Sequence, residues 1–357
     1  MQQEQEGADP EGSLGVLDLT VGARAVGGGG LGVPDLTVGA RAVGSGGLGV
    51  LVGARADGDP VAAWEMARLA DRLGYTEIMI GEATGHDAFA LGTALGEGTA
   101  KLCLGPLPAA VRDPVTTARG AATVTALTGR ATGVALAAST STVVEDWHGR
   151  SRSDAVTIVA ESAQALRGLL AGEPVDYSGA LVRTKGFEGA LPPSHAELSV
   201  LAFGAELTEV AAARADRLIL PIGTVEHVSR LRARVQAASE RVGRASAPKI
   251  ALWLPVAVEP DAEMRRTMLR DLVPYLRSAG FSGMFSEAGF GEVVRLARSG
   301  AHVRSVVAAA PPELLASVTA VGDVAAVRAV LGEFRAVGVD DVILVPDRPE
   351  TLEALAP

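Results

Sequence analysis

Eight short apolar segments, separated by helical patterns, constrain the fold of this chain more than any other feature. Continuous apolar character over about five to eight residues is typical of a strand that is buried on both faces. The segments are 49–55, 77–81, 101–105, 132–138, 198–203, 217–221, 250–256 and 341–345. Eight strand–helix units in succession predict an α/β fold of the (β/α)₈ TIM-barrel type, with an open doubly wound sheet as the alternative.

Two connections are too long for a simple strand–helix unit, which predicts insertions after strands 4 and 7. The first contains a clear amphipathic helix at 154–170 and then the run 174–183, which predicts a small β excursion. The second contains helical patterns near 261–279, 288–298 and 323–337. In a barrel, such insertions normally cover the C-terminal mouth, where the active site is built.

The front of the chain repeats itself. Residues 14–30 and 31–47 differ at two positions, and a shortened third copy begins at Leu48. Two copies of this length are too short and too few to build a solenoid. Only the third copy leads into a helix, with Asp59 as its expected cap and Pro60 at its first position. We therefore expect residues 1–47 to be a Gly-rich tail, disordered or a mis-assigned start, and 48–357 to be the barrel; a binding role for the repeat is the alternative.

Composition excludes several classes of protein. A formal charge of −10 without a Lys/Arg cluster argues against a nucleic-acid-binding protein. The single cysteine, Cys103, excludes an internal disulfide and a thiolate metal cage, and its apolar neighbours predict a buried strand residue. No metal site is predicted. No apolar run reaches the length of a membrane span and the start lacks a signal-peptide pattern, so we expect a cytoplasmic protein.

Several segments are distinctive in their order and spacing. They are 74–82 with 85–89, 104–105 with 112–114, 127–130, 143–149 (Val-Val-Glu-Asp-Trp-His-Gly), 169–177, 203–205 and 215–216. Together they resemble the luciferase-like monooxygenase superfamily, and its F420-dependent oxidoreductase branch in particular. The resemblance implies a barrel, usually a homodimer, that binds coenzyme F420 or FMN at the mouth.

The helix expected after strand five offers a phosphate site. Gly204, Ala205 and Glu206 begin this helix, so their free N–H groups would point out at the C-terminal rim, where a helix start favours an anion. Thr208 could add a hydroxyl, whereas an inward Glu206 carboxylate would repel a phosphate. The alternative is an ordinary strand-to-helix turn.

Further cofactor-binding candidates follow strands three and four. Ser139 and Thr140 open a run of four hydroxyls, which could bind a phosphate or a ribityl chain, or simply complete a loop and helix cap. Trp147 could form a pocket wall. The resemblance implies that a backbone irregularity at Gly105 supports the cofactor ring, and the prolines that follow could supply a bulge or a cis bond. Arg112 could contact an anionic cofactor tail or pair with Asp113.

Three side chains are candidates for proton transfer in the reaction. Glu82 and His86 follow strand two, and His148 follows strand four, so all three should lie at the functional face. A neutral imidazole exchanges protons near neutral pH. Hydride transfer needs such a group, because the acceptor is protonated after the hydride arrives. The alternative is that they only organise their loops; Asp87 is expected to cap the next helix. The other histidines, His195, His227 and His302, are expected to be solvated.

The resemblance and these residues predict an F420-dependent oxidoreductase that transfers a hydride between reduced deazaflavin and a small organic substrate. One alternative is an FMN-dependent monooxygenase that uses O₂ and a partner flavin reductase. The other is a family member that binds flavin without turnover, which the alanines at Ala137 and Ala205, in place of family glycines, would favour. The segment 281–285 is expected to be either packing or substrate pocket.

Overall fold

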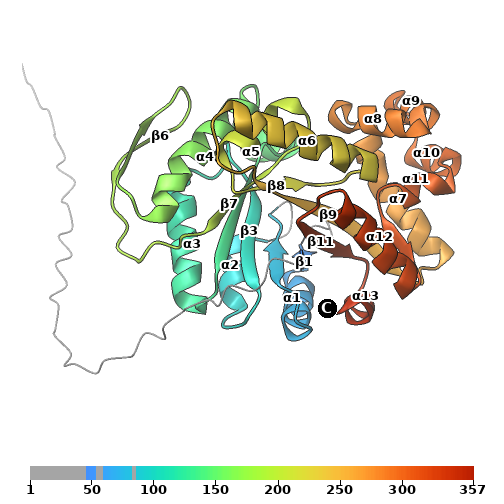
Figure 1. Ribbon diagram of the computed structural model, residues 1–357, viewed down its shortest axis with the longest axis horizontal. Helices are drawn as coiled ribbons and strands as arrows, with labels where there is room; N and C mark the ends of the chain where they lie inside the picture. Colours follow the sequence, from blue (N-terminus) through green and yellow to red (C-terminus); the bar gives the residue numbers. More distant parts are fainter. Residues whose placement is uncertain (1–45, 54–58, 83–85) are drawn as a thin grey trace, which may run out of the picture. The chain divides into compact units, whose positions relative to one another are not determined.

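Eight parallel strands close on themselves at the centre of the computed structural model, which describes residues 46–53, 59–82 and 86–357 (Figure 1). The strands are β1 (Gly47–Val52), β2 (Glu77–Ile80), β3 (Lys101–Pro108), β4 (Thr132–Ala137), β7 (Glu197–Leu201), β8 (Arg217–Leu220), β9 (Lys249–Val258) and β11 (Asp341–Pro346). Each pairs with the next, and the pairs β8–β9, β9–β11 and β11–β1 complete the circle. The predicted barrel is confirmed, because an open sheet would leave two edges unpaired.

The barrel interior is packed with side chains from alternate positions of the strands. Seven buried residues form this inner cluster: Leu51, Met79, Cys103, Ala135, Ile219, Ala251 and Ile343. The intervening residues point outward and join the larger core between strands and helices. Cys103 is fully buried, as predicted, and burial raises the pKa of its thiol to about 12, so the thiol stays protonated.

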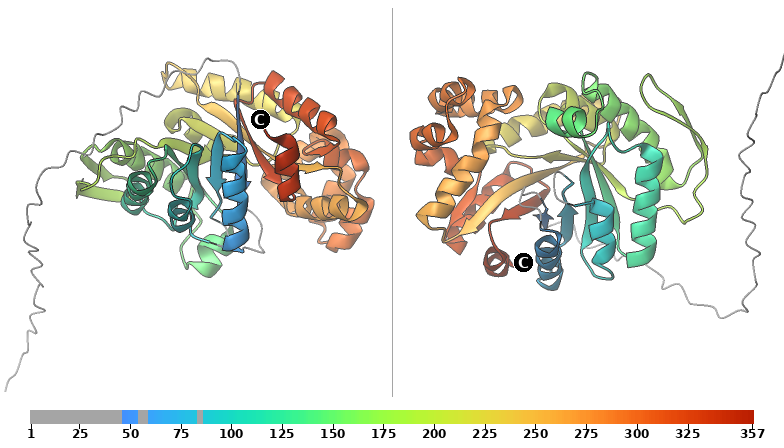
Figure 2. Two further views of the ribbon diagram at one scale, coloured as in Figure 1. Left: turned by 90° about the horizontal axis from the view of Figure 1, so that it is seen from below. Right: turned by 180° about the vertical axis from the view of Figure 1, so that it is seen from behind.

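An outer ring of helices covers the strands (Figures 1 and 2). It consists of α1 (Pro60–Arg72), α2 (Ala88–Ala94), α3 (Pro114–Thr128), α4 (Ala155–Ala171), α5 (Ala205–Arg214), α6 (Val225–Arg241), α12 (Val324–Ala336) and α13 (Pro349–Leu355). Asp59 and Asp87 accept hydrogen bonds from first-turn N–H groups of α1 and α2, which confirms both predicted caps. No helix in the described residues is long and apolar enough to cross a membrane.

The first insertion contains the π-helix η1 (Thr142–Trp147) and, after α4, a hairpin of β5 (Val175–Ser178) and β6 (Arg183–Phe187). The predicted β excursion is therefore present, but its expected position over the mouth is wrong. By the end of α4 the chain has returned to the N-terminal side of the strands, and the hairpin packs on the outside of α3 and α4. Its turn is held by Glu161 of α4, whose carboxylate accepts the backbone N–H groups of 180–182.

The second insertion begins at the C-terminal end of β9 and builds a helical unit beside the mouth (Figure 2). It comprises α7 (Ala262–Arg277), α8 (Ala279–Phe285), the π-helix η2 (Ser286–Phe290), α9 (Gly291–Arg298), α10 (Val303–Ala309), α11 (Pro312–Ala316) and the short β10 (Ala320–Gly322). These elements share a core of their own, which includes Met268, Leu272 and Phe285. The strand β10 adds to β9 outside the circle of eight.

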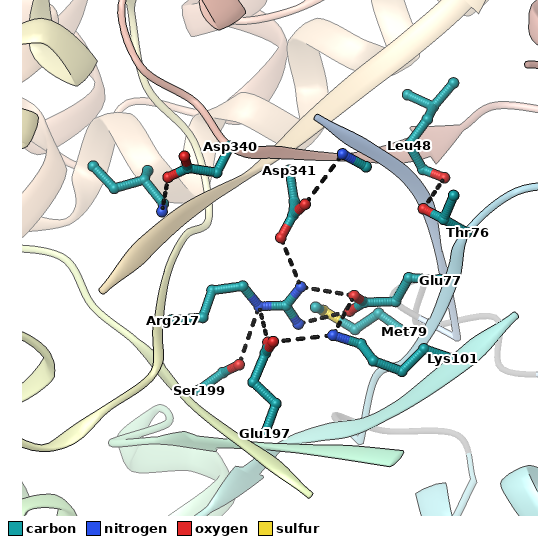
Figure 3. A network of polar contacts seen from close by, with 12 residues as sticks. Leu48, Thr76, Glu77, Met79, Lys101, Glu197, Ser199, Arg217, Asp340 and Asp341 are labelled. Carbon is teal, nitrogen blue, oxygen red and sulfur yellow. Dashed lines mark hydrogen bonds and ion pairs between the residues drawn. The ribbon is translucent and has the colours of Figure 1, made fainter. Parts of the chain in front are cut away.

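A buried network of charges fills the opposite, N-terminal end of the barrel (Figure 3). Each of its five ionic members is the first residue of a strand: Glu77, Lys101, Glu197, Arg217 and Asp341. Arg217 lies at the centre, with Nε 2.9 Å from Glu197 Oε1 and Nη1 3.3 Å from Asp341 Oδ2. Residues at this end of a barrel serve stability rather than catalysis, so an active site is expected at the other end.

The described part of the barrel begins with β1 at Gly47, and the predicted division of the chain at 47/48 stays a prediction. The tail predicted at 1–47 lies outside the described residues except for its last two, so its state stays a prediction. Ala54 and Arg55, expected at the end of the first strand, also lie outside the described residues, and β1 ends at Val52.

Candidate active site

A cavity of about 580 Å³ opens at the C-terminal mouth of the barrel. Its floor and strand-side wall come from Leu51 of β1, Trp253 and Pro255 of β9, and Val345 of β11. The insertion closes the other side with Met268 and other residues of α7. This is the size and the mainly apolar lining of a small-molecule or cofactor site.

A few polar groups converge on this cavity, from Arg270, Asp271, Tyr275, Thr319 and Asp347. Burial, with a further contribution from the charge of Asp271, raises the pKa of the Tyr275 phenol, so the phenol stays protonated at neutral pH. The side chain of Asp347 is 2% exposed and accepts a hydrogen bond from Thr351 Oγ1 at 2.5 Å. Sequence reasoning missed these residues because four of them belong to the second insertion or its edges, where no pattern marks a pocket.

Trp253 is held in place within the same cavity. Its indole Nε1 donates a hydrogen bond to the sulfur of Met79 at 3.1 Å, inside the barrel. The ring therefore presents a fixed aromatic surface at the mouth, of the kind that packs well against a flat ligand.

The predicted backbone irregularity is present in β3. The peptide bond Gly105–Pro106 is cis, and the register against β4 shifts between Leu104 and Leu107. Gly105 has a φ of 116°, and a Cβ there would lie 2.5 Å from the carbonyl oxygen of Ala135. Only glycine fits this position.

Glu82 is tied into an ion-pair cluster at the ends of β2 and β3. Arg112 donates from Nε to Glu82 Oε1 at 2.6 Å and from Nη2 to Oε2 at 2.8 Å, and it also pairs with Asp87. Glu82 Oε2 accepts the N–H of Ala88 as well. Of the two alternatives for Arg112, the pairing with Asp113 is wrong, because Asp113 instead caps α3.

His86 packs against the end of β1. A Cβ on Gly53 would lie 2.1 Å from the imidazole, so glycine is what allows the ring this close. Both ring nitrogens are buried, and neither has a hydrogen-bond partner among the described residues. Such an imidazole is costly in a purely structural role.

The candidates after β4 lie at an exposed part of the rim. The Thr140 hydroxyl accepts the N–H of Val143 at 3.3 Å, as the capping alternative predicts, and the carbonyl of Ser139 accepts Arg152 Nε at 2.9 Å. Trp147, at the end of η1, is 54% exposed, and His148 directly after it is also exposed.

At the start of α5, the backbone is open to solvent. Gly204, Ala205 and Glu206 are exposed, and no side chain caps this helix among the described residues. Thr208 is buried and donates its hydroxyl to the Gly204 carbonyl at 2.6 Å, so that hydroxyl is used within the helix.

His227 departs from its expected solvated position. It lies in the first turn of α6, is half-buried, and stacks on Phe203 with ring centroids 5.2 Å apart. Burial lowers its pKa, and the nearby charges of Arg230 and Arg234 lower it further. His195 is exposed as expected, and exposed His302 caps α10 through its ring nitrogen.

The site residues predicted from the sequence follow β2, β3, β4 and β7, which are consecutive neighbours in the barrel. The mouth cavity lies on the other arc, above β8, β9, β11 and β1. Within the described part of the chain, none of the predicted site residues lines that cavity. The predicted site residues and the residues that line the cavity therefore lie on opposite sides of the same C-terminal rim.

The comparisons with known proteins agree with this geometry. Residues 45–341 match the family model described as luciferase-like monooxygenase. No curated protein sequence matched the chain.

Among solved structures, the coenzyme F420-dependent tetrahydromethanopterin reductase from Methanopyrus kandleri has a TM-score of 0.74 at 15% identity, covering 88% of this chain and 98% of its own. An F420-dependent secondary alcohol dehydrogenase in complex with an F420–acetone adduct has a TM-score of 0.71 at 16% identity, covering 88% and 100%. EDTA monooxygenase from Chelativorans has a TM-score of 0.63 at 13% identity, covering 87% and 92%. These likenesses establish the shared fold, and the family match over most of the sequence establishes that this chain belongs to the luciferase-like monooxygenase family.

Proposed function

We propose that the protein is an F420-dependent oxidoreductase that transfers a hydride between the reduced deazaflavin and a small organic substrate. The observation that carries the proposal is the mainly apolar cavity at the barrel mouth, bounded by Trp253 and α7. Family membership supports an oxidoreductase, and F420-dependent enzymes are among the solved structures with this fold.

The residues present fit a flat aromatic cofactor with an anionic tail. The cavity offers apolar walls and a fixed indole for the ring. The tail has space at Gly204, where an added Cβ would meet no atom within 4 Å, and the first-turn N–H groups of α5 are uncapped by any described side chain. We assign the phosphate to Gly204, Ala205 and Glu206 on this basis. Glu206 is exposed, so its carboxylate can turn to solvent.

With the cofactor bound, this chain would position the ring, shield the reacting atoms from water and supply a proton to the substrate. A deazaflavin supplies the hydride when bound. A ring held in the mouth cavity would face, across the rim, the β3 bulge at Gly105 and the residues Ser139, Thr140 and Trp147 that follow β4. Apolar residues of the cavity would keep water from the reacting atoms.

We assign proton transfer to a histidine. Glu82 is already engaged by Arg112 and the N–H of Ala88, so its role in the proposal is to hold the loop that carries His86. His148 is exposed, and no described hydrogen bond restrains its imidazole, which leaves the ring able to approach a substrate. His86 is the second candidate, since both its nitrogens lack described partners.

A second candidate function is an FMN-dependent monooxygenase, favoured by the same fold in EDTA monooxygenase and in an FMN-bound Baeyer–Villiger monooxygenase. It would need a partner flavin reductase. We also propose a homodimer, as the family resemblance implies; light scattering after gel filtration tests this directly.

Separate titrations with F420 and FMN, followed by ring fluorescence, test the proposal. Micromolar or tighter binding of F420 together with weaker binding of FMN supports it. The reverse order supports the monooxygenase, and binding of neither would contradict both enzymes. F420 binding without any hydride transfer to a panel of small carbonyl compounds would favour the non-catalytic alternative.

A further inference from the structure

A second, smaller cavity of about 220 Å³ lies between the start of α5, helix α6 and helix α8. We call it the α6 pocket and define it by Phe203, Gly204, Thr208, His227, Arg230 and Arg234. Arg230 and Arg234 are one helical turn apart on α6, so both guanidinium groups project on the same side of the helix. The helix α5 also begins here, with its uncapped N-terminal turn.

The charge of the α6 pocket is positive. Arg230 is paired with Glu287, with Nη2 2.6 Å from Oε2, so much of its charge is offset. Among the described residues, no carboxylate forms an ion pair with Arg234. The positive field is felt by His227, whose pKa is lowered by burial and then by both arginines. An anion entering this pocket would therefore find an available guanidinium and a helix start.

An aromatic row links the α6 pocket to the mouth cavity. Tyr275, which lines the mouth, meets Phe281 edge to face with centroids 5.0 Å apart. Phe281 stacks on Phe203 at 3.7 Å, and Phe203 stacks on His227 at 5.2 Å. The row therefore places the α6 pocket and the mouth cavity next to each other, one at each end of four contacting rings.

We propose that the α6 pocket binds an acidic group of the cofactor tail that lies beyond the phosphate, and that Arg234 is its main contact. This inference rests on the proposed function and deepens it. Coenzyme F420 continues past its phosphate with carboxylates, whereas FMN ends at its phosphate. The α6 pocket thus favours the deazaflavin, because FMN lacks the acidic group that would form this contact beyond the phosphate.

The test compares charge-removing variants of one helix. Arg234→Gln should weaken F420 binding about tenfold, the loss of one charge-assisted contact, and should weaken FMN binding much less, because FMN has no acidic group beyond its phosphate. Arg241→Gln is the matched control, since Arg241 lies on the same helix but pairs with Glu209 on the surface. Glu287→Gln should tighten F420 binding severalfold by freeing Arg230. Dissociation constants come from fluorescence titration, and thermal melting verifies that each variant is folded.

The outcomes separate this inference from the proposed function. If the wild type binds neither cofactor, the proposed function fails. If the wild type binds F420 and Arg234→Gln binds it equally well, the α6 pocket is not the tail site and only this inference is overturned. Equal losses for F420 and FMN, or a matching loss in Arg241→Gln, would also overturn it.

Discussion

Arg217 and Glu77 form a doubly hydrogen-bonded ion pair inside the barrel, although 140 positions separate them in the sequence. Nη1 donates to Oε2 at 2.7 Å and Nη2 donates to Oε1 at 2.6 Å. Arg217 is fully buried, and the side chain of Glu77 is 7% exposed. The pair joins β8 to β2 across the N-terminal end of the barrel (Figure 3). The mouth lies at the opposite end of the same strands.

Glu77→Gln is expected to destabilise the fold by about 2–3 kcal/mol, because Arg217 loses its doubly hydrogen-bonded partner and Lys101 loses one of its two carboxylates, while Glu197 still faces both cations. Urea denaturation measures the loss. The control is Glu263→Gln, which breaks an exposed pair with Arg266 on α7 and should change stability by less than about 1 kcal/mol. A similar small effect for both variants would show that the network contributes little.

The same carboxylate makes stability depend on acid pH. Burial opposes ionisation of Glu77, but the charges of Lys101 and Arg217 outweigh it and lower its pKa from 4.5 to about 2. Because the folded pKa is depressed, the stabilisation is complete above pH 4.5 and is lost as the pH falls toward 2. Denaturation of wild type and Glu77→Gln across this range should give converging curves at low pH. A constant difference down to about pH 2 would contradict the assignment.

Gly105→Ala should both destabilise the protein and weaken cofactor binding. A Cβ there meets the Ala135 carbonyl at 2.5 Å, and the φ of 116° is unfavourable for any other residue. We expect a loss of at least about 2 kcal/mol. Gly332→Ala in α12, where no atom lies within 4 Å of the added Cβ, is the control and should be neutral or slightly stabilising. Retention of full stability in Gly105→Ala would mean that the β3 bulge relaxes easily.

His148→Ala should keep cofactor affinity while turnover falls about 100-fold or more, as expected for loss of a general acid. Affinity is read from cofactor fluorescence and turnover from cofactor oxidation. His86→Ala, measured in parallel, identifies the donor if His148→Ala turns over normally. Normal turnover in both variants would remove the histidines from proton transfer.

The sequence was most informative about the barrel and least informative about the mouth. Buried strands such as β4 and β8 are uniformly buried along their length, and helices such as α1 start at capping aspartates, so local chemistry alone places them. The predicted position of the β5–β6 hairpin was wrong, because the sequence of a β excursion does not indicate which end of the barrel it will cover.

The other contacts that the sequence did not predict join residues that are far apart in the chain. Glu77 and Arg217 each begin an apolar segment, and nothing in either segment reveals that they meet. Similarly, Tyr275, Phe281 and Phe203 become a row only once α7 and α8 bring Tyr275 and Phe281 against Phe203. Arg112 pairs with Glu82 rather than with its neighbour Asp113, because the cap of α3 already occupies that carboxylate.

The central claim, that a deazaflavin occupies the mouth cavity, is tested most directly with Trp253 as the reporter. The chain has three tryptophans, and replacing Trp64 and Trp147 by Phe leaves Trp253, which lines the cavity, as the sole source of indole emission. Because Trp147 is itself proposed to border the cofactor, the F420 dissociation constant of this variant is first compared with that of the wild type. Titration with F420 should quench this emission strongly, with the same midpoint as the change in F420 fluorescence. F420 binding that leaves Trp253 emission unchanged, or no binding of F420 by the wild type, would contradict the claim.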